Sequence, residues 1–336
     1  MISQNQNVIQ SDSLLSSPSS KAIDADSYFK KNTPPSNLNE ITAKSAEFIA
    51  TNTKLGRPVV LVTSGGTTVP LENNTVRFVD NFSAGTRGAI SAEFFLKSGY
   101  SVIFLHRKHS LQPFNRKYAT PELGFLDFLF ISQEGTVKIK PQYEESLIHD
   151  IALFNDIISQ NRLYMPTFIT LSDYLFSLRE ITNLLNPLGP NAFFYLAAAV
   201  SDFFIPADKM VEHKIQSSEG ELSLTMNQVP KFLKPLVNSW APNSFVVSFK
   251  LETDPNLLEA KARLSLEKYG HQAVVANILH TRKNVVWIIK RDSMDKAEEI
   301  RLSDEEIKNH VEIEQYIIKK LIKIHNSFIQ NSKSSS

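Results

Sequence analysis

The feature that most constrains the fold is an apolar segment followed by two glycine turns, between residues 59 and 96. Residues 59–62 read Val-Val-Leu-Val, and four consecutive apolar, mostly β-branched residues favour a strand buried on both faces of a parallel sheet. Ser64-Gly65-Gly66-Thr67 follows at the carboxyl end of this predicted strand, where open α/β sheets bind their ligands. The chain is therefore expected to place a glycine turn at the edge of a covered sheet.

A second glycine turn, at residues 85–88, leads into a predicted helix over residues 89–98. Apolar residues recur there at helical spacing, and Gly99 ends the pattern. A glycine turn that opens a helix gathers free backbone N–H groups at the positive end of the helix dipole, which suits an anion. The alternative is that these glycines only permit positive φ angles. The segment contains neither a Walker-type phosphate loop nor the G-x-G-x-x-G pattern of dinucleotide sites.

The rest of the chain alternates predicted strands and helices, which is typical of a doubly wound α/β fold. Further strands are predicted at residues 101–105, 192–200, 245–249, 273–276 and 285–289, with 123–132 as another candidate. Helices are predicted at residues 41–55, 141–160, 170–185, 230–240 and 311–329, and one more ends at 269. Residues 214–224 depart from this alternation and predict a β-hairpin with its turn around Glu219-Gly220.

The two ends of the chain differ from this pattern in composition. Residues 1–37 are rich in Ser, Asn and Pro, which predicts a mobile arm. Residues 38–330 are expected to form one α/β domain, and residues 331–336 a flexible tail.

Composition excludes several classes of site and partner. The 336 residues carry a net charge of +1 and contain no cysteine, which excludes disulfides, thiolate metal sites and a cysteine nucleophile. A balanced charge gives no reason to expect a nucleic-acid partner, and no apolar segment approaches the ~18 residues of a membrane span. We therefore expect a soluble, cytoplasmic protein. The basic segment over residues 106–117 is either a solvated loop or a contributor to a phosphate site or a neighbouring subunit.

The alanines that end the predicted strand at residues 192–200 have two interpretations. On a strand, three small side chains leave room for a ligand to approach the backbone. On a helix, they would pack against a neighbour, with Asp202 as a cap.

Five separated blocks together resemble phosphopantothenate–cysteine ligase, also called phosphopantothenoylcysteine synthetase, in its free-standing eukaryotic form. They lie in the right order at residues 62–88, 194–206, 212–218, 247–254 and 274–279. The resemblance covers roughly residues 40–325. It implies a Rossmann-like, mostly parallel sheet with helices on both faces, a homodimer, and a small β-hairpin dimerisation element at about residues 208–228.

The family's reaction joins 4′-phosphopantothenate to L-cysteine through an acyl-nucleotide made from ATP or CTP, with release of pyrophosphate and a nucleoside monophosphate. Mg²⁺ is implied by the triphosphate, but no metal ligand can be named. The bacterial K-x-K-K pattern is replaced here by Lys214-Ile215-Gln216-Ser217, and the choice between ATP and CTP stays open.

The resemblance also implies roles for individual residues. Asn81 and Lys214 are the implied catalytic residues. The implied nucleotide-binding residues are Gly65, Ser83, Gly85, Gly88, Phe249 and Asn277. The implied substrate-binding residues are Asn81, Ala198, Ala199 and Asp202, with Arg77 as a candidate for a phosphate.

Other interpretations remain for these residues. Taken alone, Asn81 would be a turn residue or helix cap, and Lys214 a solvated charge. A short-chain-type, NAD(P)-dependent oxidoreductase is an alternative enzyme class, because residues 316–320 satisfy a Y-x-x-x-K spacing. A non-catalytic nucleotide-binding protein is another.

Overall fold

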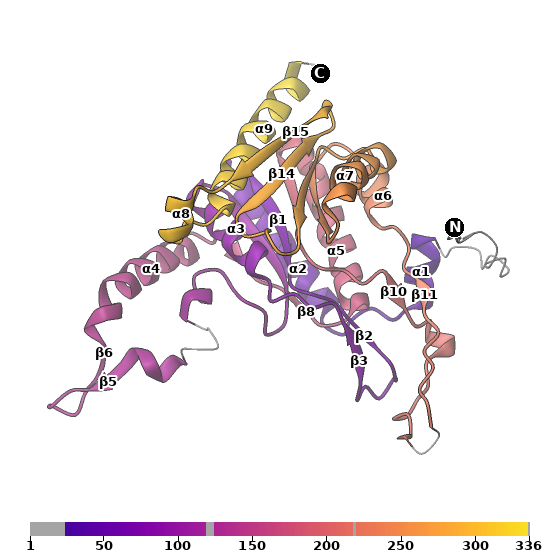
Figure 1. The fold of residues 1–336 in the computed structure, drawn as a ribbon, viewed down its shortest axis with the longest axis horizontal. Helices are drawn as coiled ribbons and strands as arrows, with labels where there is room; N and C mark the ends of the chain where they lie inside the picture. The colour runs from indigo at the N-terminus through magenta and orange to yellow at the C-terminus, as the bar shows by residue number, and fades with distance from the viewer. Residues whose placement is uncertain (1–23, 119–123, 218–219, 335–336) are drawn as a thin grey trace, which may run out of the picture.

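A nine-stranded, mostly parallel sheet runs through the computed structural model, which describes residues 24–118, 124–217 and 220–334. The strand order is β15-β14-β13-β12-β9-β1-β4-β7, and β8 also pairs with β4 (Figure 1). Within this sheet, the β13–β14 and β14–β15 pairings are antiparallel, and the other pairings are parallel. The strands are β1 (Val59–Ser64), β4 (Ser101–Arg107), β7 (Leu163–Tyr164), β8 (Thr167–Phe168), β9 (Ala192–Leu196), β12 (Phe245–Glu252), β13 (Ala273–Ile278), β14 (Val285–Lys290) and β15 (Ser293–Arg301).

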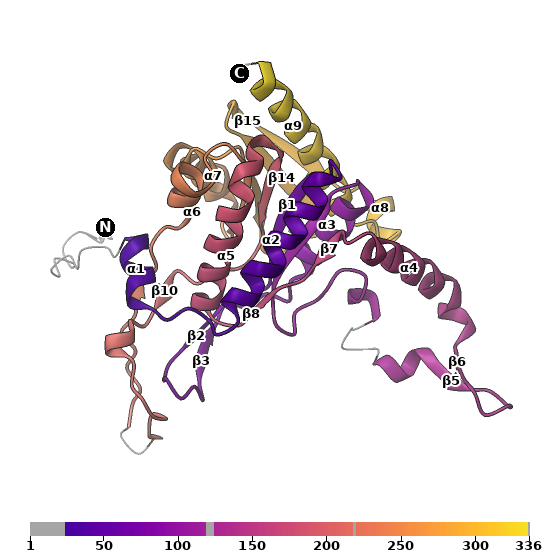
Figure 2. The same ribbon diagram turned by 180° about the vertical axis from the view of Figure 1, so that it is seen from behind.

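Helices cover both faces of the sheet, which explains the unbroken apolar pattern of β1. Its Val59 and Leu61 point into one core and its Val60 and Val62 into the other, because successive side chains alternate across a strand. On one face lie α2 (Leu38–Lys54) and α5 (Leu171–Leu185), side by side in Figure 2, and α7 (Pro255–Tyr269). On the other lie α3 (Thr86–Lys97) and α9 (Glu314–Ser334). The predicted doubly wound α/β class is confirmed.

The remaining elements are one helix of 19 residues and several short helices, turns and strand pairs outside the main sheet. The helices are α1 (Ala25–Lys31), α4 (Pro141–Ser159), α6 (Leu233–Pro235) and α8 (Asp304–Lys308), with 3₁₀ turns at Arg116–Tyr118, Phe125–Phe128, Asn186–Asn191 and Ala207–Lys209 and a π-helical turn at Leu236–Trp240. The paired short strands are β2 (Thr68–Pro70) with β3 (Phe78–Asp80), β5 (Leu129–Ile131) with β6 (Val137–Ile139), and β10 (Phe203–Phe204) with β11 (Asn227–Gln228).

The structure corrects two expectations within the domain and adds a strand that was not expected. The candidate strand at 123–132 is a 3₁₀ turn followed by β5, which pairs with β6 rather than with the main sheet. The helix expected at 230–240 is the short α6 continued by a π-helical turn. The edge strand β15 escapes prediction, because its charged sequence lacks the apolar alternation of a strand.

The expected arm over residues 1–37 is wrong for residues 25–31, while residues 1–23 lie outside the described part of the chain. Residues 25–31 form α1, whose Tyr28 and Phe29 are buried. The Tyr28 ring lies 5.2 Å from the Phe204 ring and 5.4 Å from the Phe232 ring. Two aromatic residues in a short polar segment give no periodic signal from which a helix could be predicted. In the folded chain, burial of their rings anchors α1 to the domain. The expected tail is likewise helical as far as Ser334.

Residues 214–217 and 220–224, the described part of the predicted hairpin, do not form paired strands. The antiparallel pair lies where β10 meets β11, and the described residues 205–217 and 220–226 extend from that pair as an arm (Figure 1). Glu219, expected in the turn, lies outside the described residues. Leu222 and Leu224 do alternate, but both are exposed, and an isolated hairpin without a buried apolar face is only marginally stable. Of the helices described, none is both long and apolar enough to cross a membrane.

Three histidines are buried in the core. His325 contacts the Tyr100 hydroxyl at 2.7 Å, and His271 contacts the Ser248 hydroxyl at 2.8 Å. Burial lowers the pKa of His106, His271 and His325 to about 4, each from an ordinary value of 6.5. These side chains are therefore neutral in the folded protein at neutral pH.

We expect the free energy of unfolding to fall as the pH is lowered from about 6.5 toward about 4. In this window the unfolded chain binds protons that the folded chain excludes, so stability is fully present above the window and is lost within it. Each histidine contributes on the order of 1.4 kcal/mol per pH unit. Urea unfolding between about pH 7 and pH 5 measures the slope. His271→Asn should make the slope shallower, and a flat profile for the unmodified chain would contradict the expectation.

Candidate active site

The two glycine turns meet at the carboxyl end of β1. Gly65 and Gly85 both have left-handed backbone conformations, with φ values of +85° and +84°. The Ser64 hydroxyl donates a 3.0 Å hydrogen bond to the carbonyl oxygen of Gly85, the residue that precedes α3. A Cβ atom at Gly88 would lie 2.5 Å from the Ser64 Cβ. The start of α3 is thus seated directly on the end of β1, with no side chain between them.

Asn81 is brought against the first turn by the short β2–β3 pair. Its backbone N–H donates to the carbonyl oxygen of Thr67 at 3.2 Å. A Cβ atom at Gly66 would lie 2.8 Å from the Asn81 carbonyl carbon, so only glycine fits there. Ser83 follows, and its hydroxyl accepts from the N–H of Gly85 at 3.4 Å. The structure therefore brings together both turns, Asn81 and Ser83, as the sequence predicts.

The alanines after β9 cross over the first turn. The N–H of Ala198 donates to the Thr63 hydroxyl at 3.2 Å, and that of Ala199 to the Gly65 carbonyl at 2.9 Å. These residues follow the end of β9 and are not helical, so the helical interpretation of this segment is wrong. The small side chains of Ala198 and Ala199 therefore lie next to the backbone of the first glycine turn.

A cavity of about 280 Å³ opens beside these alanines. Its lining includes Ala198, Asp202 and Phe249, three of the residues singled out from the sequence. The Asp202 side chain is 72% exposed and lies 3.2 Å from the ammonium group of Lys231. A mostly apolar pocket with one carboxylate and one cation suits a small polar-ended ligand.

Phe249 and Asn277 lie on the adjacent strands β12 and β13. The Phe249 ring packs edge-on against Tyr195, with ring centres 4.9 Å apart. Asn277 is paired in register with Leu251 and is buried near the carboxyl end of β13. Both therefore lie near the same edge of the sheet as the glycine turns, because these strands are parallel to β1.

Arg77 and Lys214 lie outside this cluster. The Arg77 guanidinium forms a 2.8 Å ion pair with the buried Glu72 and donates to the Ile215 carbonyl at 3.1 Å. Burial opposes the charge of Glu72, but hydrogen bonds from the N–H groups of Arg77 and Val76 and from the guanidinium outweigh it and lower the pKa. Lys214 is exposed on the arm next to Ile215. Arg77 therefore fastens the arm to the turn between β2 and β3.

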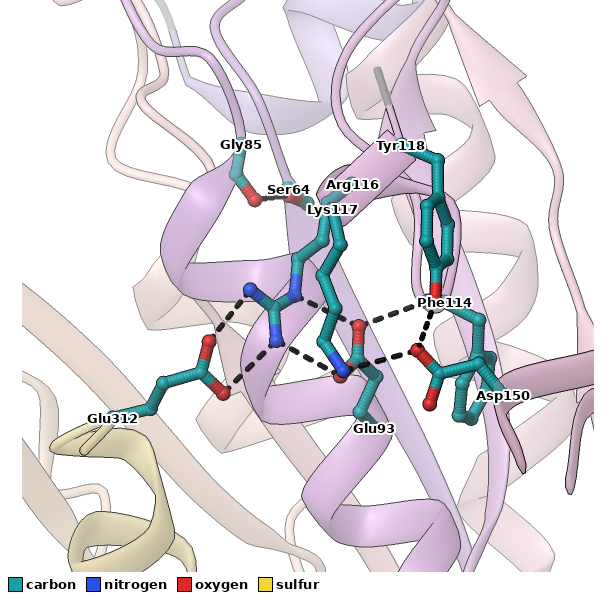
Figure 3. Close-up of polar contacts among 9 residues, drawn as sticks. All are labelled: Ser64, Gly85, Glu93, Phe114, Arg116, Lys117, Tyr118, Asp150 and Glu312. Atoms are coloured by element: carbon teal, nitrogen blue, oxygen red, sulfur yellow. Dashed lines mark hydrogen bonds and ion pairs between the residues drawn. The ribbon is translucent and has the colours of Figure 1, made fainter. Parts of the chain in front are cut away.

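A buried ion cluster holds the helix that carries the second turn (Figure 3). Glu93 of α3 accepts from the Phe114 N–H and from two guanidinium nitrogens of Arg116, at 2.8, 2.8 and 3.0 Å. Arg116 also pairs with Glu312. Burial disfavours the charge on Arg116, but the two carboxylates outweigh burial and raise its pKa. Arg116 of the basic segment is thus structural.

Sequence reasoning missed several residues that shape the site. Ser64 joins the two turns, and Arg107 and Asp80 form a 2.6 Å ion pair beside them. The signal for Arg107 was its place in the basic segment after the second strand, although nothing there distinguished it from its neighbours. In the described ranges 24–118, 124–217 and 220–334, no three His, Asp or Glu side chains group as metal ligands would.

The packing of Gly88 on Ser64 makes a prediction about stability. A Gly→Ala change within a helix normally stabilises it, but at Gly88 the new Cβ would collide with the end of β1. We expect Gly88→Ala to lower the free energy of unfolding by about 1–3 kcal/mol, measured by urea unfolding. Gly124→Ala is the control, because its Cβ would have no neighbour closer than 3.5 Å. Equal stability of the two variants would show that α3 is not seated as described.

Comparison with known proteins identifies relatives over most of the chain. The family model of the DNA/pantothenate metabolism flavoprotein C-terminal domain matches residues 179–316. The chain is 42% identical to phosphopantothenate–cysteine ligase CAB2 of Saccharomyces cerevisiae, over 94% of this chain and 90% of that protein. It is 47% identical to phosphopantothenate–cysteine ligase of Homo sapiens, over 84% of this chain and 91% of that protein.

Solved structures agree with these relatives. A Cab2 mutant in complex with phosphopantothenate-cysteine matches with a TM-score of 0.85 and 44% identity, over 92% of this chain and 99% of that chain. The DNA/pantothenate metabolism flavoprotein from Streptococcus pneumoniae shares the fold, with a TM-score of 0.54, 18% identity and coverage of 81% and 99%. On this identity and coverage, the chain belongs to the phosphopantothenate–cysteine ligase family, and its relatives are carbon–nitrogen ligases of coenzyme A biosynthesis.

Proposed function

We propose that this chain joins 4′-phosphopantothenate and L-cysteine through an acyl-nucleotide formed from ATP or CTP. The observation that carries the proposal is the seating of the α3 start on the end of β1, beside Asn81 and the alanines after β9. With the nucleotide at the two turns, that arrangement would place its phosphates next to a pocket for a small ligand, which supports the proposal. The names of the relatives, and the complex of a Cab2 mutant with phosphopantothenate-cysteine, support the choice of substrates.

The triphosphate would bind at the two turns. Gly85 has no side chain with which to cap α3, so the first N–H groups of the helix remain available to an anion. Gly65, Ser83, Gly85 and Gly88 would surround the phosphates, with the nucleoside toward Phe249 and Asn277. The positive end of the α3 dipole then stabilises the negative charge.

The acyl substrate would bind beside the alanines. Ala198 and Ala199 admit the pantothenate backbone because their side chains are small, and the exposed Asp202 carboxylate accepts a hydrogen bond from it. Asn81 would hold the reacting carboxylate and then the acyl-nucleotide, since its backbone is fastened to Thr67 at the first turn. Arg77 would bind a phosphate group of the substrate only if the arm held that phosphate close to the guanidinium.

The reaction proceeds in two displacements. A carboxylate oxygen of 4′-phosphopantothenate attacks the α-phosphorus of the nucleotide, and the bond to pyrophosphate breaks. The amine nitrogen of cysteine then attacks the acyl carbon, the bond to the nucleoside monophosphate breaks, and the amine loses a proton. Because the chain contains no cysteine, a thioester on the enzyme is excluded. The protein's share is therefore orientation and charge stabilisation.

Mg²⁺ would accompany the triphosphate. The described residues offer no ready cluster of three metal-ligating side chains, which fits an ion held mainly by phosphate oxygens and water. Asp80, which precedes Asn81, is a carboxylate at this edge that could add one ligand. Bound there, the ion would neutralise charge on the phosphates.

We further propose a homodimer built around the arm and the β2–β3 pair. Both elements leave the sheet in the same direction in Figure 1 and carry exposed apolar side chains. The Phe82 side chain is 93% exposed, and those of Phe78, Phe203 and Leu222 are about half exposed. Apolar surface of this kind is typical of an interaction site. Contact with a second copy would also fix Lys214, which the fold of one chain leaves exposed on the arm.

The alternative enzyme class finds no support. The Tyr316–Lys320 spacing lies in α9, and the Tyr316 hydroxyl donates to Glu306 rather than facing the glycine turns.

The proposed function makes a direct prediction. Incubation with 4′-phosphopantothenate, cysteine, Mg²⁺ and ATP or CTP should release pyrophosphate in amounts equal to the amide formed, because each acyl-nucleotide yields one product. Mass spectrometry of quenched reactions without cysteine should detect the acyl-nucleotide. Absence of pyrophosphate with both nucleotides would rule the function out.

Lys214 tests the role of the arm. If its ammonium group stabilises charge on the reacting groups, Lys214→Gln should lower turnover by more than ~100-fold with unchanged thermal unfolding. Lys209→Gln is the matched control, because that lysine is exposed at the base of the same arm. Turnover of Lys214→Gln equal to that of the control would remove Lys214 from the site.

A further inference from the structure

Arg107 packs directly against the first glycine turn. It is the last residue of β4, the strand paired with β1, so it lies at the same edge of the sheet. A Cβ atom at Gly65 would lie 2.8 Å from the Arg107 Cβ. No side chain therefore separates the arginine backbone from the turn.

The loop after Arg107 also contacts the second turn. A Cβ atom at Gly85 would lie 3.3 Å from the Ser110 Cβ, and the N–H of Leu111 donates to the Ala84 carbonyl at 3.0 Å. The segment that carries Arg107 therefore spans both turns. Its guanidinium pairs with Asp80, the neighbour of Asn81, at 2.6 Å.

The Arg107–Asp80 pair differs from the other arginine pairs near this edge in its exposure. The Asp80 side chain is 35% exposed. Arg77, Arg87 and Arg116 are each held by at least one carboxylate that is at most 8% exposed, namely Glu72, Glu314 and Glu93. Breaking a buried pair is strongly unfavourable, whereas a solvated pair contributes little. Of these four arginines, Arg107 can exchange its carboxylate for a phosphate at least cost.

We propose that Arg107 is a further triphosphate-binding residue of this site, that it contacts the two phosphates that leave as pyrophosphate, and that Asp80 positions it before the nucleotide arrives. The inference rests on the proposed function. A planar guanidinium can donate two parallel hydrogen bonds to phosphate oxygens. It would stabilise the charge that develops on pyrophosphate as the bond to the α-phosphorus breaks.

The test compares nucleotides that contain or lack the leaving phosphates. Equilibrium binding is measured with the non-hydrolysable triphosphate analogues and with the monophosphates of adenosine and cytidine. Arg107→Gln should weaken triphosphate binding by about 10- to 100-fold and leave monophosphate binding within about threefold of the unmodified protein. Arg107→Lys should recover part of the loss, since it restores the charge without the paired donors.

Two further variants separate binding from structure. Lys108→Gln removes the same charge from the next, exposed residue and should bind both nucleotides normally. Asp80→Asn should weaken triphosphate binding less than Arg107→Gln does, because the arginine remains and loses only the carboxylate that positions it. Loss of monophosphate and triphosphate binding to the same extent in Arg107→Gln, or no loss of either, would overturn the inference. An unmodified protein that binds neither nucleotide would overturn the proposed function as well.

Discussion

The site depends on one packing contact, the seating of the first turn of α3 on the last residue of β1. It requires a hydrogen bond from the Ser64 hydroxyl to the Gly85 carbonyl and the absence of a side chain at Gly88. The contact aligns free N–H groups with the edge of a parallel sheet, where the alanines after β9 also arrive. The proposed anion and substrate sites therefore share one edge of the sheet.

Charges away from this edge keep the helix in place. Glu93, Arg116 and Glu312 form an ion cluster that joins three parts of the chain. Glu93 belongs to α3, Arg116 to the segment after β4, and Glu312 lies two residues before α9 begins. Such a cluster is costly to bury, yet removing one partner is more costly still. It therefore holds α3 in one register. Arg107, in the same segment, has a partly solvated partner and remains available for ligand exchange.

The elements that carry the remaining proposed residues are held less firmly. Lys214 lies on the arm, which is fastened through Glu72, Arg77 and the backbone of Ile215 rather than by a core of its own. Exposed apolar side chains on the arm and on the β2–β3 pair leave surface for a second copy to cover. Elements with few buried contacts move most easily, which suits the role proposed for Lys214.

The sequence by itself determined the α/β class and the positions along the chain of β1, β4, β9, β12, β13 and β14. The period of apolar residues and the position of glycine are local properties, and they suffice for the turns at Gly65 and Gly85 to be found, whereas Asn81 is implied only by the family resemblance. Only the tertiary structure decided which cations are structural, that Tyr28 and Phe29 anchor α1, and that the described residues 214–217 and 220–224 do not pair as strands. These outcomes depend on contacts between distant segments, such as Arg116 with Glu312, and a local pattern contains no information about such partners.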